Sequence, residues 1–343
     1  MRIVTFYQKF INIACLNFLC TITLPVTRLT RHILYPGMRY LTFVVLISLS
    51  ACKSSTTGIQ ETPTSGKIKI AVDESFKPLL DTEIYTFMQL YDGADITPLY
   101  KAEYDVINDF MKDSVKNIVT SRKLTEDQIQ YLRDTLIIAR TVTFAYDAIA
   151  LVTNRNNPDT LINYDSVRDI FMGESVTWKD LNPKSKLGSI SVIFDNTKSG
   201  NIRYFKELFN ISDNLPGYFY AVNSNAEVID YVSRNPGALG IISVNWISDR
   251  DDSTSMSFIK KIKVAAVSQQ FASDGYYYRP YQGSIYDKSY PFVREIYFIT
   301  RETFNGLGKG FIQWATAEQG QRIVLKSGLV PATMPIRLVQ IKN

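Results

Sequence analysis

The stretch from Ser189 to Phe209 most constrains how this chain can fold, because it joins a strand pattern to a helix pattern across a short polar turn. Residues 190–194 alternate with the period of a buried strand. Beyond the turn, apolar residues recur at helical spacing, at Ile202, Phe205, Leu208 and Phe209. Ser199 is placed to cap the helix, and Gly200 lets the backbone approach a ligand closely. The free N–H groups of the helix start predict an oxyanion cradle, although an ordinary capped turn explains the pattern equally well.

Strand and helix patterns alternate along the chain after residue 66, which predicts a mainly parallel α/β sheet flanked by helices. The expected strands are residues 67–72, 95–100, 116–120, 190–194, 238–244 and 260–267. Polar turns follow three of them, at residues 73–78, 121–122 and 195–201. Ligands of such sheets bind beyond the carboxyl ends of the strands, so we expect the binding region at these turns.

Two long apolar stretches suggest how the chain divides. Residues 136–153 are almost continuously apolar or β-branched, and we expect two strands here that pass from one lobe into another. Residues 292–300 are expected to return the chain to the first lobe. The prediction is a two-lobe fold with a ligand cleft, in which lobe 1 is residues 67–146 plus 284–343 and lobe 2 is residues 147–283.

Residues 1–51 have the features of a signal segment. A basic start at Met38 leads into a short apolar core, and residues 49–52 form a lipobox whose Cys52 is expected to be acylated. Residues 10–26 could instead form a transmembrane helix, but we expect Met38 to be the true start. The lipidated cysteine and a flexible tether would occupy residues 52–66. Because the tether lacks an acidic run, we expect a lipid anchor on the periplasmic side rather than at the surface.

The composition excludes several chemistries. The only cysteines and the only histidine are Cys15, Cys20, Cys52 and His32, all in or beside the signal segment. The rest of the chain therefore has no disulfide, no Ser-His-Asp or Cys-His nucleophile and no histidine zinc site. No metal or cofactor motif occurs, and none is expected to bind. The net charge of +5 comes from the signal segment, so nucleic-acid binding is not expected.

A set of motifs together resembles the periplasmic phosphate-binding proteins of phosphate ABC transporters, a family of type II solute-binding proteins. The motifs are residues 169–173, 177–178, 181–183, 199–200 and 235–240. Their order agrees over nearly all of residues 67–343. The resemblance implies two α/β lobes that close over an oxyanion without performing chemistry, and an ABC permease of the inner membrane as partner. We expect a monomer.

The resemblance also implies ligand-binding residues where positions match. Ser75 and Phe76 would supply a hydroxyl and a backbone N–H from the first turn. Ser199, Gly200 and Asn201 would form the turn at the helix start. Neutral dipoles and helix termini of this kind suit a tetrahedral anion.

Two positions depart from the family. Its aspartate, which takes the proton of hydrogen phosphate, falls on Ser121, and its arginine falls near Asp195. Without that aspartate, the site would lose the acceptor that rejects sulfate. Arg122 is therefore a candidate bidentate donor, with Glu103 as its charged partner. Two further charged candidates are Lys198 and Arg203.

Three functions stay open on the sequence alone. The favoured one is a lipid-anchored solute-binding protein that captures phosphate or a related oxyanion and delivers it to a permease. A carboxylate-dependent phosphoester hydrolase would need a carboxylate pair, for which the candidates are Asp195, Glu103 and Asp147. An envelope lipoprotein that binds a protein or polymer would not need the three turns to converge.

Overall fold

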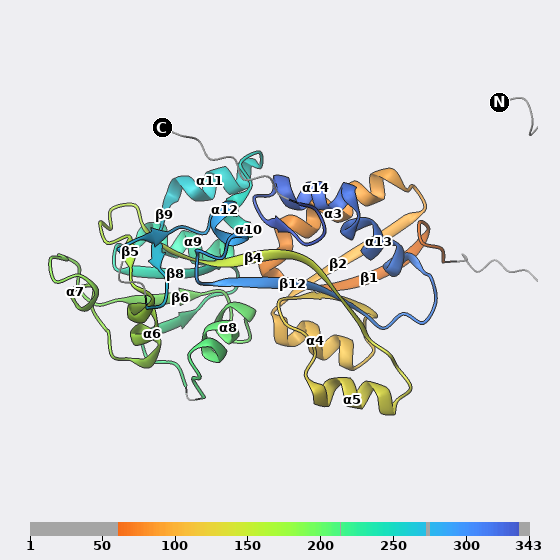
Figure 1. Ribbon diagram of the computed structural model, residues 1–343, viewed down its shortest axis with the longest axis horizontal. Coiled ribbons are helices and arrows are strands. Elements are labelled where there is room, and N and C mark those ends of the chain that lie inside the picture. Colours follow the sequence, from red (N-terminus) through yellow and green to blue (C-terminus); the bar gives the residue numbers. More distant parts are fainter. Residues whose placement is uncertain (1–60, 213, 272–274, 336–343) are drawn as a thin grey trace, which may run out of the picture. The chain divides into compact units, whose positions relative to one another are not determined.

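A sheet of ten strands runs through the part of the chain that the structure describes (Figure 1), in the order β2-β1-β3-β12-β4-β8-β6-β7, with β9 and β13 also paired to β4. This computed structural model describes residues 61–212, 214–271 and 275–335. All of them belong to one compact unit, residues 60–343. The predicted signal segment, Met38 and Cys52 lie outside the described residues. No helix of the described ranges is long and apolar enough to cross a membrane.

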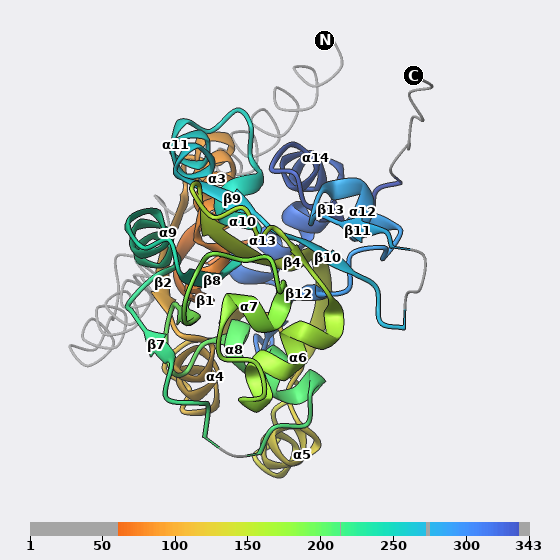
Figure 2. The ribbon, with the colours of Figure 1, turned by 90° about the vertical axis from the view of Figure 1, so that its left-hand side faces the viewer.

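The first half of the sheet contains three parallel strands, and β12 pairs with β3 in the antiparallel sense. Figures 1 and 2 show α3, α13 and α14 over one face and α4 and α5 over the other. The elements are β1 (Gly66–Asp73), η1 (Glu74–Phe76), α3 (Lys77–Leu90), β2 (Ala94–Lys101), α4 (Glu103–Met111), β3 (Asn117–Thr120), α5 (Glu126–Asp134), β12 (Val293–Thr300), α13 (Leu307–Thr316), α14 (Glu318–Lys326) and β13 (Val330–Pro331).

The second half contains the parallel strands β6, β7 and β8, and a small separate sheet has the order β11-β10-β5. The elements are β4 (Arg140–Asn154), β5 (Leu161–Ile162), α6 (Tyr164–Met172), α7 (Trp178–Leu181), β6 (Ser191–Phe194), α8 (Gly200–Leu208), β7 (Phe219–Ala221), α9 (Asn225–Arg234), β8 (Ala238–Ser243), α10 (Asn245–Ser248), α11 (Ser253–Lys261), β9 (Ile262–Val264), β10 (Ala266–Ser268), β11 (Tyr277–Tyr278) and α12 (Gln282–Tyr286).

Strand β4 joins the two halves, and the prediction of two strands in this stretch is wrong. Residues 140–148 pair with β12, and residues 149–153 pair with β8. No glycine or proline interrupts the stretch, and nearly all of its second part is buried, so the strand continues from one half into the other. Figure 1 shows β4 and β12 running side by side across the molecule.

Two other elements that were predicted as single are each split into two in the structure. The helix expected over 310–326 is two helices that meet at Ala317. The strand expected over 260–267 starts late, because Lys260 and Lys261 end α11, and it is split into β9 and β10 around Ala265. Element type was otherwise predicted well where apolar periodicity was strong.

Helix α8 is fixed by aromatic packing. The ring of Phe205 lies 4.8 Å from the rings of both Phe171 and Phe292, measured between centroids, and Phe209 also contacts it. Phe205 is fully buried, and burial of such a side chain stabilises a fold by about 1.5–3 kcal/mol. This packing holds the N-terminus of α8 at the carboxyl end of β6.

Candidate anion-binding site

The three predicted turns converge beyond the strand ends. The Glu103 carboxylate accepts hydrogen bonds from the backbone N–H and the hydroxyl of Ser121. A Cβ built on Gly200 would lie 2.8 Å from Asp73 Oδ2 and 3.0 Å from Glu103 Oε1. The α8 turn, the β1 turn and the end of β3 are therefore in direct contact, and only glycine fits at position 200 without a shift.

The turn after β1 presents polar atoms of two buried residues. Asp73 Oδ1 accepts from the backbone N–H of Ser75 at 3.0 Å, which fixes the turn. Neither Asp73 Oδ2 nor Ser75 Oγ has a hydrogen-bond partner among the described residues. Phe76 caps α3 without a side-chain hydrogen bond, and Pro78 occupies the first turn of that helix. The predicted hydroxyl donor, Ser75, is thus free to bind a ligand.

The turn after β6 is organised by Asp195, which is buried. Ser199 Oγ and Asn201 Nδ2 both donate to Asp195 Oδ1, at 2.6 and 3.0 Å. Ser199 Oγ also accepts from the backbone N–H of Asn201, which confirms that Ser199 caps α8. Asp195 thus holds the two neighbouring side chains in position.

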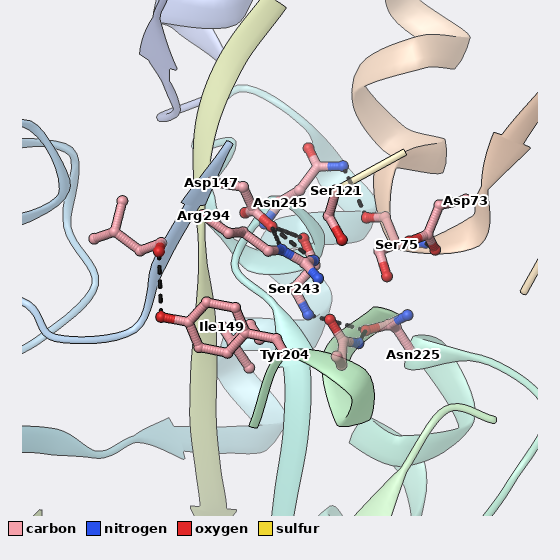
Figure 3. A network of polar contacts seen from close by, with 12 residues as sticks. Asp73, Ser75, Ser121, Asp147, Ile149, Tyr204, Asn225, Ser243, Asn245 and Arg294 are labelled. Atoms are coloured by element: carbon pink, nitrogen blue, oxygen red, sulfur yellow. Dashed lines mark hydrogen bonds and ion pairs between the residues drawn. The ribbon is translucent and has the colours of Figure 1, made fainter. Parts of the chain in front are cut away.

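Arg294 on β12 supplies a guanidinium that the sequence did not lead us to expect at the site. Its Nε donates to Asp147 Oδ2 at 3.0 Å, and Nη2 lies 2.9 Å from the same oxygen without hydrogen-bond geometry. Its Cζ atom lies 5.0 Å from the centroid of the Phe76 ring. Figure 3 shows the guanidinium pointing from β12 toward Ser75 and Ser121. Both partners of the ion pair are buried.

We define the cradle as six residues whose buried polar atoms lack a hydrogen-bond partner among the described residues: Asp73, Ser75, Asp147, Asn201, Asn245 and Arg294. Their unpartnered atoms include donors, namely Ser75 Oγ and Arg294 Nη1. They also include acceptors, namely one carboxylate oxygen of each aspartate and the amide oxygens of Asn201 and Asn245. Buried polar groups without partners are rare in folded proteins, so those that gather in the cradle are available to hold a ligand.

Burial controls the charge of the carboxyl groups around the cradle. It raises the pKa of Asp73 to about 8, helped by the charge of Glu103 and opposed by Arg294. It raises the pKa of Glu74 to about 7, although Asn225 donates a hydrogen bond to that carboxyl group. The pKa values of Asp147 and Asp195 are also raised by burial. The cluster therefore carries less negative charge near neutral pH than its composition suggests.

A cavity of about 700 Å³ lies outside the cradle, at the mouth between α4 and α8. Glu103, Arg122, Lys198, Ser199 and Arg203 all line it. Arg203 forms the ion pair with Glu103 that was predicted for Arg122. Burial alone would raise the pKa of Glu103, but Arg203 and Ser121 outweigh it and lower that pKa.

The Arg122 guanidinium forms hydrogen bonds beside its own turn and to α5, and none to a cradle residue among the described residues. Its Nη1 donates to the carbonyl of Lys123 at 2.9 Å and to Gln128 Oε1 at 3.2 Å. Lys198 Nζ lies 2.8 Å from Asp105 Oδ1 on α4. We define the rim as these charged groups at the mouth: Glu103, Asp105, Arg122, Lys198 and Arg203. The structure places the rim in contact with the predicted turns, and ligand contact by its members stays a prediction.

Sequence reasoning missed Arg294, Asp73 and Asn245 as members of the site. The available signal for Arg294 was a charged side chain in a strand whose only other charged residue is Glu295, because a buried charge needs a reason. Asp73 was noted only as part of the first turn. No group of three or more metal-binding side chains occurs in the described ranges.

Parallel strands joined by crossing antiparallel strands, with a polar cradle beyond the strand ends, define the class of the two-part α/β solute-binding fold. Residues 57–319 match the family model described as PBP superfamily domain, and the chain belongs to that superfamily. The resemblance stated from the sequence is thereby confirmed.

Curated relatives are similar to this chain over most of its length. The phosphate-binding protein PstS of Borreliella burgdorferi is 23% identical over 274 residues, covering 77% of this chain and 89% of that protein. PstS of Staphylococcus aureus is 21% identical over 282 residues, covering 80% and 81%.

A putative phosphate ABC transporter substrate-binding protein with bound phosphate, from Clostridium perfringens, superposes with a TM-score of 0.66 at 23% identity, covering 78% of this chain and all of that one. An ABC-type phosphate transport receptor from Vibrio cholerae gives a TM-score of 0.59 at 20% identity, with coverage of 78% and 100%. These likenesses show the mixed α/β fold.

Proposed function

We propose that the chain is an extracytoplasmic solute-binding protein that holds phosphate, or a closely related oxyanion, in the cradle and delivers it to an ABC permease. The names of the relatives support a phosphate-binding protein without turnover. Lipid attachment at Cys52 and a periplasmic location are part of the same proposal and rest on the sequence of the signal segment.

The observation that carries the proposal is the mixture of unpartnered donors and acceptors in the cradle. Ser75 Oγ and the Arg294 guanidinium would donate to an oxyanion, together with the N–H groups at the start of α8. Asp73 Oδ2 would instead need to accept a proton from the ligand or to share one with it. A phosphate that retains a proton meets both demands, whereas sulfate at neutral pH can only accept.

Asp73 would therefore take the role of the family's aspartate, whose position falls on Ser121 in the sequence resemblance. Ser121 has a hydroxyl in place of a carboxylate, and it donates that hydroxyl to Glu103. Asp73 comes from the neighbouring turn and is buried against Gly200. Above its pKa of about 8 the Asp73 carboxyl group is ionised, so it would repel a fully ionised anion and accept the proton of hydrogen phosphate. In that pH range Asp73 would select for the protonated ligand.

Contacts between the two halves of the sheet support closure over the ligand. Glu74 Oε2 accepts from Asn225 Nδ2 at 2.6 Å, and Asn245 Nδ2 donates to the carbonyl of Ser75 at 3.3 Å. We propose that the halves are the two lobes of residues 67–146 plus 284–343 and residues 147–283. These contacts would form when the lobes close.

Calorimetric titration of the full chain with phosphate and with sulfate at pH 9, where Asp73 is ionised and hydrogen phosphate still carries a proton, tests the proposal. We expect saturable phosphate binding with one site and much weaker sulfate binding. In Asp73→Asn, the ratio of phosphate to sulfate affinity should fall by about tenfold or more, because the amide cannot repel sulfate. Asp105→Asn is the matched control, since its carboxylate belongs to the rim, and it should leave the ratio unchanged.

Absence of binding by either anion, in protein first unfolded and refolded to remove bound ligand, would contradict the proposal. If Asp73→Asn binds both anions with the parent's ratio of phosphate to sulfate affinity, phosphate binding stands as proposed. Asp73 is then not the group that discriminates against sulfate.

A further inference from the structure

A second cavity, of about 780 Å³, lies apart from the cradle and the rim and shares no lining residue with either. It is formed by α10, α11, β9 and the segment 279–282 that leads into α12. Its volume is within the range of about 300–1,000 Å³ that is usual for ligand pockets. Neither the predictions from the sequence nor the proposed phosphate function gives this cavity a role.

The cavity wall is mainly apolar. Val244, Ile247 and Ile262 are buried at its base, while Met256 and Ile259 are only partly buried and face the open space. Methionine adapts its shape to irregular apolar ligands, so this wall suits a flexible hydrocarbon chain.

The charged groups that line the cavity all carry the same sign. They are Arg250, Lys263 and Arg279, and no carboxylate lines the cavity. Lys263 Nζ donates to the carbonyl of Asn157 at 3.0 Å, and Arg279 Nε donates to the carbonyl of Val264 at 3.2 Å. Two of the three cations are therefore held against the apolar wall by backbone acceptors.

None of these three cations forms an ion pair with a carboxylate within the described ranges. The terminal nitrogens of Arg279 also have no hydrogen-bond partner there, so its planar fork is available for an anionic head group. An apolar wall with cations at its edge is complementary to a molecule that has a hydrocarbon chain and an anionic head.

We propose that this cavity binds one hydrocarbon chain of an amphiphile whose head group is a carboxylate or a phosphate. The chain packs on Met256, Ile259 and Ile262, and the head lies between Arg279 and Lys263. The ligand is either a free amphiphile, such as a fatty acid, or a lipid held in a membrane. The site is independent of the cradle, so phosphate binding and amphiphile binding can be tested separately.

Calorimetric titration of the full chain with decanoate and with decyltrimethylammonium, both below their micelle concentrations, compares the same chain with opposite head groups. Decanoate should bind saturably, and the cation should bind about tenfold more weakly or not at all. Equal binding of the two amphiphiles, or no saturable binding of decanoate, would overturn the proposal.

Two variants locate the site. Arg279→Gln removes the head-group contact and should weaken decanoate binding by about tenfold or more. Met256→Glu places a carboxylate on the apolar wall and should have a similar effect. Arg133→Gln, on exposed α5, is the matched control and should bind normally. Phosphate titration of each variant checks that it is folded. Unchanged decanoate binding in both cavity variants would overturn the assignment.

Co-sedimentation with vesicles separates the two sources of the ligand. Phosphatidylglycerol vesicles are compared with phosphatidylcholine vesicles, for the parent chain and for Arg279→Gln. Binding to phosphatidylglycerol that depends on Arg279 supports a membrane lipid. Decanoate binding without such dependence supports a free amphiphile. If Arg279→Gln changes neither decanoate binding nor vesicle binding, the proposal is wrong.

Discussion

The cradle and the rim both pair guanidinium or ammonium groups with carboxylates, but they do so in different surroundings. In the cradle, the side chains of Arg294 and Asp147 are 2% and 0% exposed. In the rim, the side chains of Lys198 and Asp105 are 51% and 38% exposed. Water and salt screen the second pair and hardly reach the first. The Arg294–Asp147 pair should therefore determine stability and affinity, whereas the exposed Lys198–Asp105 pair of the rim should have little effect on either.

The largest effect is expected for Arg294→Met. Removing one partner of a buried ion pair leaves Asp147 without its countercharge, which costs about 3–5 kcal/mol of unfolding free energy. Denaturant unfolding of the ligand-free chain at pH 8 measures the loss. The double variant with Asp147→Asn should recover part of it. A loss below about 1 kcal/mol would place this pair with the exposed ones and would break the comparison.

An intermediate effect is expected from the carboxyl group of Asp73. Because its folded pKa of about 8 lies above the ordinary aspartate value of 3.8, the folded state retains a proton that the unfolded state releases. Between these values the unfolding free energy should fall as pH rises, by about 1.4 kcal/mol per pH unit for this proton. Glu74, with a pKa raised to about 7, adds to the slope below pH 7.

Asp73→Asn should flatten this slope, and denaturant unfolding at several pH values from 5 to 8 measures it. The rim variant Asp105→Asn is the control and should retain the slope of the parent. An unchanged slope in Asp73→Asn would show that the proton resides elsewhere in the cluster.

The smallest effect is expected for Lys198→Ala. Its partner Asp105 is exposed, so the unfolding free energy should not change measurably. The association rate for phosphate, followed by stopped flow at low salt, should fall by no more than about twofold, and the difference should vanish at high salt. A loss of affinity as large as that of a cradle variant would show that the rim contributes directly to the ligand site.

The turns were predictable because each is encoded locally. A strand pattern, a capping serine and a glycine lie within a few residues of one another around Ser199, and the fold brings such turns to the same edge. The contact of Arg294 with the first turn could not be predicted in this way. It depends on the pairing of β12 with β4, between segments more than a hundred residues apart.

Arg122, by contrast, was predicted as a ligand donor, but its hydrogen bonds in the structure go elsewhere. Its position beside Ser121 suggested that it pointed into the site, but side-chain direction depends on the nearest available acceptors. Gln128, a member of the capping box that starts α5, accepts from Arg122. The capping box therefore supplies the acceptor for the neighbouring arginine, which the position of Arg122 in the sequence did not indicate.

The central claim is that Arg294, and not Arg122, holds the oxyanion. Calorimetric titration of phosphate into Arg294→Gln and Arg122→Gln compares the two guanidinium groups directly, with circular dichroism as a check on folding. We predict that Arg294→Gln weakens phosphate binding by at least about thirtyfold, whereas Arg122→Gln changes the phosphate affinity by less than about threefold. Normal binding by a folded Arg294→Gln, together with loss in Arg122→Gln, would contradict it.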